Sequence, residues 1–179
     1  VLVSAYSAGG TSMYSLDSLL ASELATPYLG QAGYGGLSVS DMEKFMSGKT
    51  ASFQSSVNTY QEGGSGNAMN KDLETLFELI YVNFTSLNKN EAVFNALLNN
   101  LKAYYPSLLS NPQTFFQVAI SDKQNEGNER YAGFPSAEDF EAINYDLAYS
   151  LRESRFADAN DFTFFIVGNF DPENLESLA

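Results

Sequence analysis

The pattern of apolar residues changes from strand-like to helical at Asn70, and this change sets the expected architecture. Residues 49–69, KTASFQSSVNTYQEGGSGNAM, lack helical periodicity and are rich in Ser, Thr and Val. This composition favours two strands, the second beginning near Tyr60 and loosened by glycines. After Asn70, the expected N-cap, six apolar residues recur at helical spacing and predict one helix face: Leu73, Leu76, Phe77, Ile80, Tyr81 and Phe84.

The first 48 residues predict one strand and two helices. Residues 1–7 form a short apolar run rich in β-formers, which is typical of a buried strand, and a Gly-Gly turn ends it. A helix is expected over about 16–28, and residues 30–36 read as a glycine-rich loop. A short helix follows, with these signals: Ser38 or Ser40 as N-cap, Asp41 or Glu43 at the third position, and Gly48 beyond the end.

Helices dominate the region after residue 85. One helix is predicted by the spacing of Val93, Leu97, Leu101, Tyr104 and Leu108. Another is expected to begin with Asn111 as cap and Pro112 at the first helical position. A capping box of Ser136 and Asp139 then predicts one long helix, with an apolar side made of Phe140, Ile143, Leu147 and Leu151.

Residues 161–168, DFTFFIVG, give the strongest strand signal in the chain. They are apolar on both faces, so we expect this strand to be central in its sheet. A last helix is expected to begin with Asp171 as cap and Pro172 at its first position. The mixture of adjacent strands and grouped helices predicts an α+β fold, a mostly antiparallel sheet covered by helices.

The chain is long enough for one domain. Its 179 residues, 44% of them hydrophobic, would bury roughly 70% of the unfolded surface, and we expect residues 1–179 to form a single α+β domain. The sequence opens in an apparent strand and stops in an apparent helix, with neither an initiator Met nor a signal peptide. It reads as a piece of a longer polypeptide. No run of about 18 apolar residues exists, so no membrane insertion is expected.

Charge and missing residue types exclude several functions. The formal net charge is −13, and the nine basic residues are mostly scattered, which argues against binding to nucleic acid or to anionic membrane surfaces. The chain contains no cysteine and no histidine. These absences remove thiolate nucleophiles, zinc–sulfur sites, the commonest metal ligand and the commonest general base.

Two loops superficially suggest binding sites. Residues 63–66, GGSG, are glycine-rich, but no Lys follows as in a phosphate-binding loop, so we interpret them as a bulged or edge strand with close backbone contacts. Residues 158–162, DANDF, lack the calcium-loop pattern and are interpreted as a capped turn between a helix and a strand.

Five stretches together resemble the insulinase/pitrilysin-type zinc peptidases. They are SAGGTSMYSLDS, GQAGYGGLSVSDMEKFMSGKTASF, YQEGGSGNAMNKDLETLFELIYVNF, KNEAVFNALLNNLKA and FADANDFTFFIVGNFDPENLESL. They occur in order over nearly the whole chain, and DLETLFELIY followed much later by FTFFIVGNFD is the most specific element. The chain looks most like the third of four related domains in long bacterial members. The resemblance implies the metallohydrolase fold of insulinase and mitochondrial processing peptidase.

The resemblance also implies that this domain is non-catalytic. The family's catalytic repeat carries an inverted zinc motif, H-x-x-E-H, on its first helix. The comparable helix here, YSLDSLLASEL, has neither His, and Asp17 and Glu23 lie about 240° apart around it. A later helix supplies the third zinc ligand, and Glu74 and Glu78 occupy that helix here but are more typical of a solvated face. We therefore expect no catalytic, cofactor-binding or metal-binding residue in this chain, and zinc in the catalytic domain of the parent.

Two further residues receive no role from the resemblance. In the family an Arg and a Tyr of the distal half hold the scissile carbonyl, but Arg130 and Tyr131 differ from them in domain and spacing. The partners implied are the other domains of the same polypeptide and a peptide or unfolded protein substrate. A periplasmic or cell-envelope location is implied only by the kind of bacterial protein that the chain resembles.

The sequence leaves three functional hypotheses. The first is a non-catalytic domain of a zinc metalloendopeptidase, forming chamber wall and substrate contacts, inactive alone but part of an active parent. The alternative is a catalytically dead docking module related to processing-peptidase core subunits. A carboxylate-only hydrolase is the weakest, because no acid pair stands out.

Overall fold

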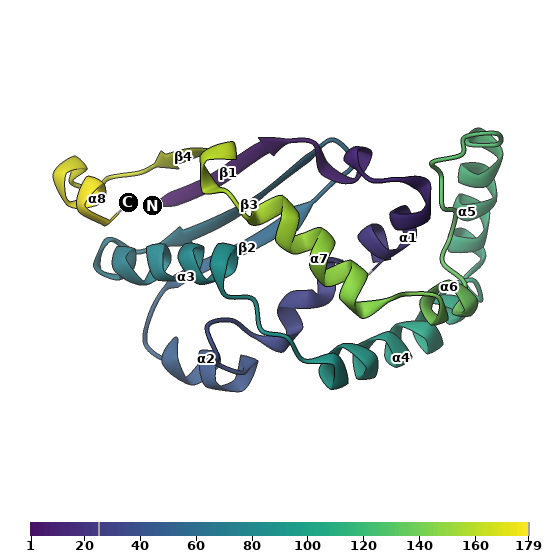
Figure 1. Cartoon of the computed structure of the whole chain (residues 1–179), viewed down its shortest axis with the longest axis horizontal. Helices are drawn as coiled ribbons and strands as arrows, with labels where there is room; N and C mark the ends of the chain where they lie inside the picture. Colours follow the sequence, from purple (N-terminus) through teal and green to yellow (C-terminus); the bar gives the residue numbers. More distant parts are fainter. Residues whose placement is uncertain (25, 179) are drawn as a thin grey trace.

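Four antiparallel strands form one sheet, in the order β2-β3-β1-β4 (Figure 1). The structure is a computed structural model and describes residues 1–24 and 26–178. The strands are β1 (Leu2–Ala8), β2 (Ala51–Val57), β3 (Gln61–Ala68) and β4 (Thr163–Val167). The helices are α1 (Leu16–Leu24), α2 (Val39–Phe45), α3 (Leu73–Thr85), α4 (Glu91–Leu108), α5 (Pro112–Gln124), α6 (Ala137–Glu141), α7 (Tyr145–Phe156) and α8 (Pro172–Leu178).

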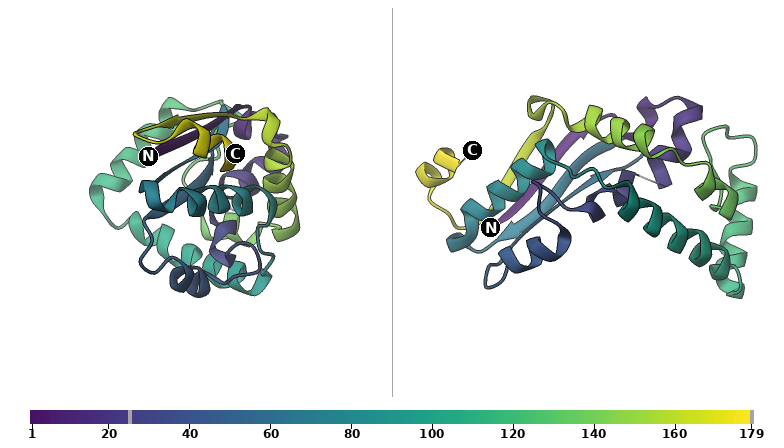
Figure 2. Two further views of the ribbon diagram at one scale, coloured as in Figure 1. Left: turned by 90° about the vertical axis from the view of Figure 1, so that its left-hand side faces the viewer. Right: turned by 60° about the horizontal axis from the view of Figure 1, so that its bottom comes forward.

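Helices α3 and α7 pack against one face of the sheet, and the other face is open (Figures 1 and 2). The side chains of β1 alternate strictly between buried and exposed, as expected for a strand with one covered face. On the covered side, Phe156 of α7 packs with Ala5, and Leu76 of α3 packs with Val3. The α+β class predicted from the sequence is confirmed.

The hairpin of β2 and β3 is confirmed, but the interpretation of its glycines is partly wrong. β3 is neither an edge strand nor bulged, because it pairs without interruption with both β1 and β2. The expected close backbone contacts are present. A Cβ at Gly63 would collide with the carbonyl oxygen of Ala5, and one at Gly64 would collide with the ring of Phe53. The glycines therefore allow close approach within a central strand.

The prediction that residues 161–168 form a central strand is wrong. β4 pairs with β1 alone and lies at the edge of the sheet. Phe165 is 57% exposed and Val167 65% exposed, because they belong to the open face. A run of apolar residues correctly predicts a strand here, but it does not show that both faces of that strand are covered. Within residues 1–24 and 26–178, no helix covers the open face on which Phe165 and Val167 lie.

Several helix starts are confirmed by their caps. Ser38 accepts from the N–H of Asp41 at 3.2 Å, and Asn111 accepts from the N–H of Gln113 at 2.9 Å, directly before Pro112. Asp171 likewise accepts from the N–H of Glu173 at 3.1 Å. These short polar side chains satisfy backbone donors that the first helical turn leaves unpaired.

The predicted single long helix after residue 136 is two helices. The capping box is present: Ser136 Oγ accepts from the N–H of Asp139, and the Asp139 carboxylate accepts from the N–H of Ser136. However, α6 ends at Glu141. Asn144 then caps α7 by accepting from the N–H of Leu147 at 2.9 Å. The side chain of Asn144 competes with the backbone for a backbone N–H, so it favours the start of a new helix over the continuation of α6.

Three other helix predictions need correction. The helix expected over 16–28 ends at Leu24, Ala25 lies outside the described residues, and Thr26–Ala32 is 3-10 helical. Asn70 is no cap, because Asn70–Asp72 forms a 3-10 turn before α3, and Tyr81 is 66% exposed rather than on the apolar face. The buried residues of α4 are Phe94 and Leu98, one position beyond the predicted Val93 and Leu97.

Helices α4, α5 and α6 form the end of the molecule that lies opposite the two chain termini (Figure 1). α4 and α6 pack around Phe94, Leu98 and Phe140, which form a second core together with Leu29 and Ala148. α5 has no buried residue and exposes Phe115 and Phe116. No helix within the described ranges is long and apolar enough to cross a membrane.

Candidate functional site

The carboxylates singled out in the sequence do not come together. Asp17 lies in the first turn of α1 and is exposed, whereas Glu23 lies at the other end of that helix, beside a small cavity that Arg130 also lines. Burial raises the pKa of Glu23, and the charge of Arg130 opposes that rise. Among residues 1–24 and 26–178, no group of three or more His, Cys, Asp or Glu side chains is placed to hold a metal ion.

Glu74 and Glu78 lie on the outer surface of α3. Both are exposed, and they line an otherwise apolar groove of about 460 Å³ between α2 and α3. Phe45 and Phe77 also line this groove. The two carboxylates therefore belong to a solvated rim.

Arg130 and Tyr131 make local structural contacts. The guanidinium of Arg130 donates to the carbonyl oxygens of Thr11 and Tyr14 at 2.8 and 3.1 Å, which fixes the segment between β1 and α1. The Tyr131 hydroxyl hydrogen-bonds to Ser121 and Asp122, both at 2.9 Å. Neither residue lines the cavity of about 1030 Å³ that lies along β2.

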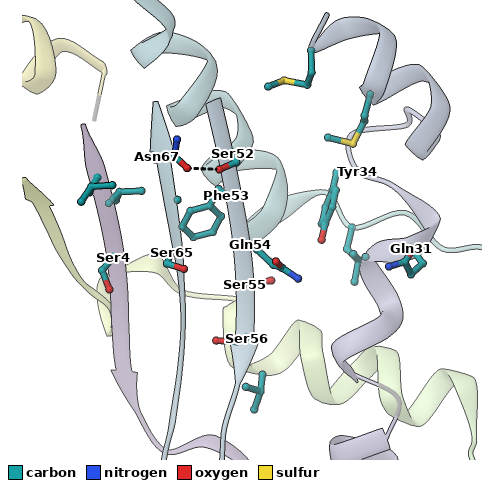
Figure 3. Close-up of a pocket in the computed structure, with 18 of the residues that line it drawn as sticks. Ser4, Gln31, Tyr34, Ser52, Phe53, Gln54, Ser55, Ser56, Ser65 and Asn67 are labelled. Carbon is teal, nitrogen blue, oxygen red and sulfur yellow. Dashed lines mark hydrogen bonds between the residues drawn. The ribbon is translucent and has the colours of Figure 1, made fainter. Parts of the chain in front are cut away.

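A cavity of about 1030 Å³ runs along β2 and over the open face of the sheet (Figure 3). We call it the β2 groove. Residues 52–57 of β2 line one side, and the segment from Thr26 to Met46, which includes α2, contributes the other. Tyr34 and Gln31 lie across the groove from Gln54 and Ser55 (Figure 3). The groove is therefore bordered by a strand over nearly its whole length.

The outer edge of β2 presents backbone hydrogen-bonding groups to this groove. At the ends of the hairpin, the N–H of Asn58 donates to Gln61 and the N–H of Met69 donates to Thr50. Because bonding alternates along an antiparallel strand, the N–H and C=O groups of Phe53, Ser55 and Val57 must point away from β3. No strand in the described ranges pairs with that edge. The groove thus contains free donors and acceptors at strand spacing.

The floor of the β2 groove is polar toward β2 and apolar toward β4. Ser4 of β1 and Ser65 of β3 lie side by side on neighbouring strands, and the Ser52 hydroxyl donates to the side-chain oxygen of Asn67 at 2.8 Å (Figure 3). Leu2 pairs with Val167 at the other side, and both are exposed. Short hydroxyl side chains and a few exposed apolar ones suit contacts with varied side chains.

Arg152 of α7 lines the inner part of the groove. It is 5% exposed, and one guanidinium nitrogen, Nη2, donates to Ser55 Oγ at 2.9 Å and to Asn83 at 3.1 and 3.2 Å. Burial lowers the pKa of Arg152 to about 10. Burial also raises the pKa of Tyr34.

Sequence reasoning missed this site. The serines of β2 are expected to lie in a strand. They do not show which face of the sheet is covered, because serine is tolerated on both the covered and the open face. Arg152 falls within a predicted helix, and only the fold shows that it is buried beside β2. Ser52, Gln54 and Ser56 recur at every second position, and this polar alternation is the local signal that could have indicated a polar face.

Comparisons with solved structures agree with this fold. No family model and no curated protein matches the sequence. The periplasmic protease PqqL from Escherichia coli superposes with a TM-score of 0.78 and 22% identity, over 99% of this chain and 19% of PqqL. The ferredoxin protease FusC, solved as a mutant in complex with Arabidopsis ferredoxin, gives 0.73 and 17%, over 99% and 19%. A peptidase M16 inactive domain from Pseudomonas fluorescens gives 0.74 and 16%, over 99% and 43%.

The chain therefore has the fold of domains found in insulinase-like peptidases, as the sequence resemblance implies. It spans about one fifth of the length of PqqL and of FusC. At these identities the likeness establishes the fold, and activity has to be argued from the site.

Proposed function

We propose that this chain is a non-catalytic domain of a zinc metalloendopeptidase and that the β2 groove forms peptide-contacting wall of the reaction chamber. The observation that carries the proposal is the unpaired edge of β2 along a cavity of about 1030 Å³. An extended peptide can add to such an edge through main-chain hydrogen bonds, which do not depend on its sequence. Such contacts suit a domain that holds substrates for a catalytic centre elsewhere.

The composition and the neighbours support the non-catalytic role. The sequence has no His or Cys, so it lacks the side chains that bind catalytic zinc in the H-x-x-E-H motif. One structural neighbour is described as an inactive domain of a peptidase, and two others as proteases. The zinc would be held by another domain of the parent polypeptide.

The substrate and location follow from the same reasoning. FusC is described in complex with a ferredoxin, so a fold of this kind occurs in a protease that binds a protein. The net charge of −13 would favour basic or unfolded segments, with an effect that weakens as salt rises. PqqL is described as periplasmic, and we propose a bacterial periplasm or cell envelope for this protein too.

A peptide-binding measurement tests this proposal. Fluorescence anisotropy of a labelled, unstructured peptide without charged side chains would be followed as the 179-residue chain is added. The double variant Met42→Ser and Met46→Ser removes two apolar side chains that line the groove. The matched control, Phe115→Ser and Phe116→Ser, removes two exposed aromatic side chains from α5. We expect binding to weaken about tenfold in the first and to stay within about twofold in the second.

The alternative is a docking module without a proteolytic parent. The exposed aromatic residues of α5 favour it, since none of the 13 residues of that helix is buried and Phe115 and Phe116 are about 60% exposed. If the α5 variant loses binding to the peptide and the groove variant does not, this alternative becomes the better account.

A further inference from the structure

Arg152 is a buried positive charge without a buried negative partner. It is 5% exposed, and its guanidinium carbon lies 3.2 Å from the centroid of the Phe156 ring. No carboxylate within residues 1–24 and 26–178 forms an ion pair with it. Its hydrogen-bond acceptors, Ser55 and Asn83, are neutral. Burying a charge without a counter-charge is costly, so such a residue calls for an explanation.

The neighbouring arginine on the same helix shows the contrast. Arg155 pairs with the carboxylate of Glu62, whose side chain is completely buried. Within the described part of the chain, the fold thus supplies a carboxylate to Arg155 and none to Arg152, which lies one turn earlier. Of the two, only Arg152 lines the β2 groove.

Two guanidinium nitrogens of Arg152 have no acceptor among residues 1–24 and 26–178. All its hydrogen bonds to the described residues use Nη2, which leaves Nη1 and Nε without a protein acceptor there. The cavity that Arg152 lines is the β2 groove, so a ligand in the groove can supply an acceptor to these nitrogens. A guanidinium placed in this way donates to carboxylates.

The surroundings favour an anion at this point. Tyr34 and Ser55 also line the groove and carry hydroxyl donors. The acidic residue among the lining side chains is Glu43, which belongs to α2. The groove therefore has a positive group from α7 and a negative group from α2.

We propose that Arg152 is a carboxylate-binding subsite within the β2 groove, which receives the C-terminal carboxylate or an acidic side chain of a bound peptide. This inference rests on the proposed peptide-binding role of the groove. It adds a preference that opposes the net charge of −13, because that charge alone would repel a carboxylate. A carboxylate preference would accordingly mark a specific contact.

The test uses one uncharged peptide sequence of about ten residues in three forms. One form has a free C-terminal carboxylate, one a C-terminal amide, and one a C-terminal amide with a single Asp. Affinities for the 179-residue chain would be measured by fluorescence anisotropy. We expect the free acid or the Asp form to bind about tenfold more tightly than the plain amide, and the form that does so identifies the source of the carboxylate.

Variants assign the preference to Arg152. Arg152→Gln should abolish the difference between acid and amide, whereas Arg130→Gln should retain it. Arg130 is a matched control because it also donates to protein oxygens but does not line the groove. If Arg152→Gln does not fold, NMR of the Nε–H groups decides: the chain has only three arginines, and the Arg152 signal should shift with the carboxylate peptide and stay in place with the amide.

Each negative result has a separate meaning. Equal binding of all three peptides would overturn the subsite and leave the peptide-binding role intact. Failure of every peptide to bind would overturn both. An acid preference that persists in Arg152→Gln, or an Arg152 signal that ignores the carboxylate, would also overturn the subsite.

Discussion

The carboxylate of Glu62 in β3 pairs with the guanidinium of Arg155 in α7, and its second oxygen accepts the N–H of Gly10. Gly10 has a φ of +62°, a left-handed conformation that favours glycine, in the turn that ends β1. One buried carboxylate therefore joins the sheet, the helix that covers it and the turn that leads to α1.

Removing this carboxylate should strongly destabilise the chain. In Glu62→Ala, Arg155 loses its counter-charge and Gly10 its acceptor, so the free energy of unfolding should fall by about 3–5 kcal/mol. Lys123→Ala is the control, because its pair with Glu126 is exposed on both sides and should matter by less than about 1 kcal/mol. Urea unfolding followed by circular dichroism measures both. Equal losses would mean that the buried pair has no special role.

Alkaline pH should weaken the fold partly through Tyr14. Burial raises the pKa of Tyr14 to about 12, while Arg155 and Arg152 oppose the rise and Glu62 adds to it. Its unfolded value is about 10, so between about pH 10 and 12 the folded chain binds more protons and stability falls as pH rises. The lowered pKa of Arg152 acts in the opposite direction, and burial, its largest cause, is present in the parent chain and in a variant at Tyr14 alike.

The comparison of the parent chain with Tyr14→Phe isolates this effect. From about pH 9 to about pH 11 the parent should lose about 1 kcal/mol more unfolding free energy than the variant. At about pH 9 the variant should be less stable than the parent, because it lacks the hydrogen bond from the Tyr14 hydroxyl to the Leu151 carbonyl, which is 3.1 Å long. Parallel pH profiles would show that Tyr14 ionises normally in the folded chain.

Phenylalanines on the two sides of the sheet should differ in their contribution to stability. Phe165→Ala on the open face should cost less than about 1 kcal/mol, because its side chain is already 57% exposed. Phe156→Ala should cost about 3–5 kcal/mol, since Phe156 is 2% exposed and packs edge-on against Phe84 at 5.2 Å. Thermal unfolding of both variants tests this. A large loss at Phe165 would show that the open face is covered in solution.

We also predict that the chain binds no zinc tightly. Without His or Cys, only carboxylates and neutral oxygens are available, and these make poor zinc sites. Metal analysis after dialysis should find far less than one zinc per chain. A stoichiometric zinc that survives dialysis would require a site that this account lacks.

The sequence predicted which segments form helices and strands better than it predicted where they lie in the fold. Caps such as Ser38, Asn111 and Ser136 act within one turn of the chain, so their partners can be read directly from the sequence. The position of β4 in the sheet could not be predicted from the sequence, because edge and central strands can share the same apolar composition. Only the pairing of β4 with β1 alone shows that β4 is an edge strand. The buried face of α4 also differs by one residue from the predicted face, since Phe94 is buried and Val93 is exposed.

The candidate site depended almost wholly on tertiary structure. The absence of His and Cys can be seen in the sequence and supports the non-catalytic role. The groove could not be seen there, because it joins β2 to Tyr34 and to Arg152, nearly one hundred residues further along the chain. Neither Ser55 nor Arg152 stands out locally, and their contact exists only in the folded chain.

A cleavage assay tests most directly whether the chain is a non-catalytic part of a zinc peptidase. An unstructured peptide would be incubated with the 179-residue chain, with the part of the proposed parent that carries H-x-x-E-H, and with the two mixed, each with and without a zinc chelator. We expect no cleavage by the chain alone, and cleavage by the mixture that the chelator stops. Cleavage by the chain alone that survives both the chelator and repurification would contradict it.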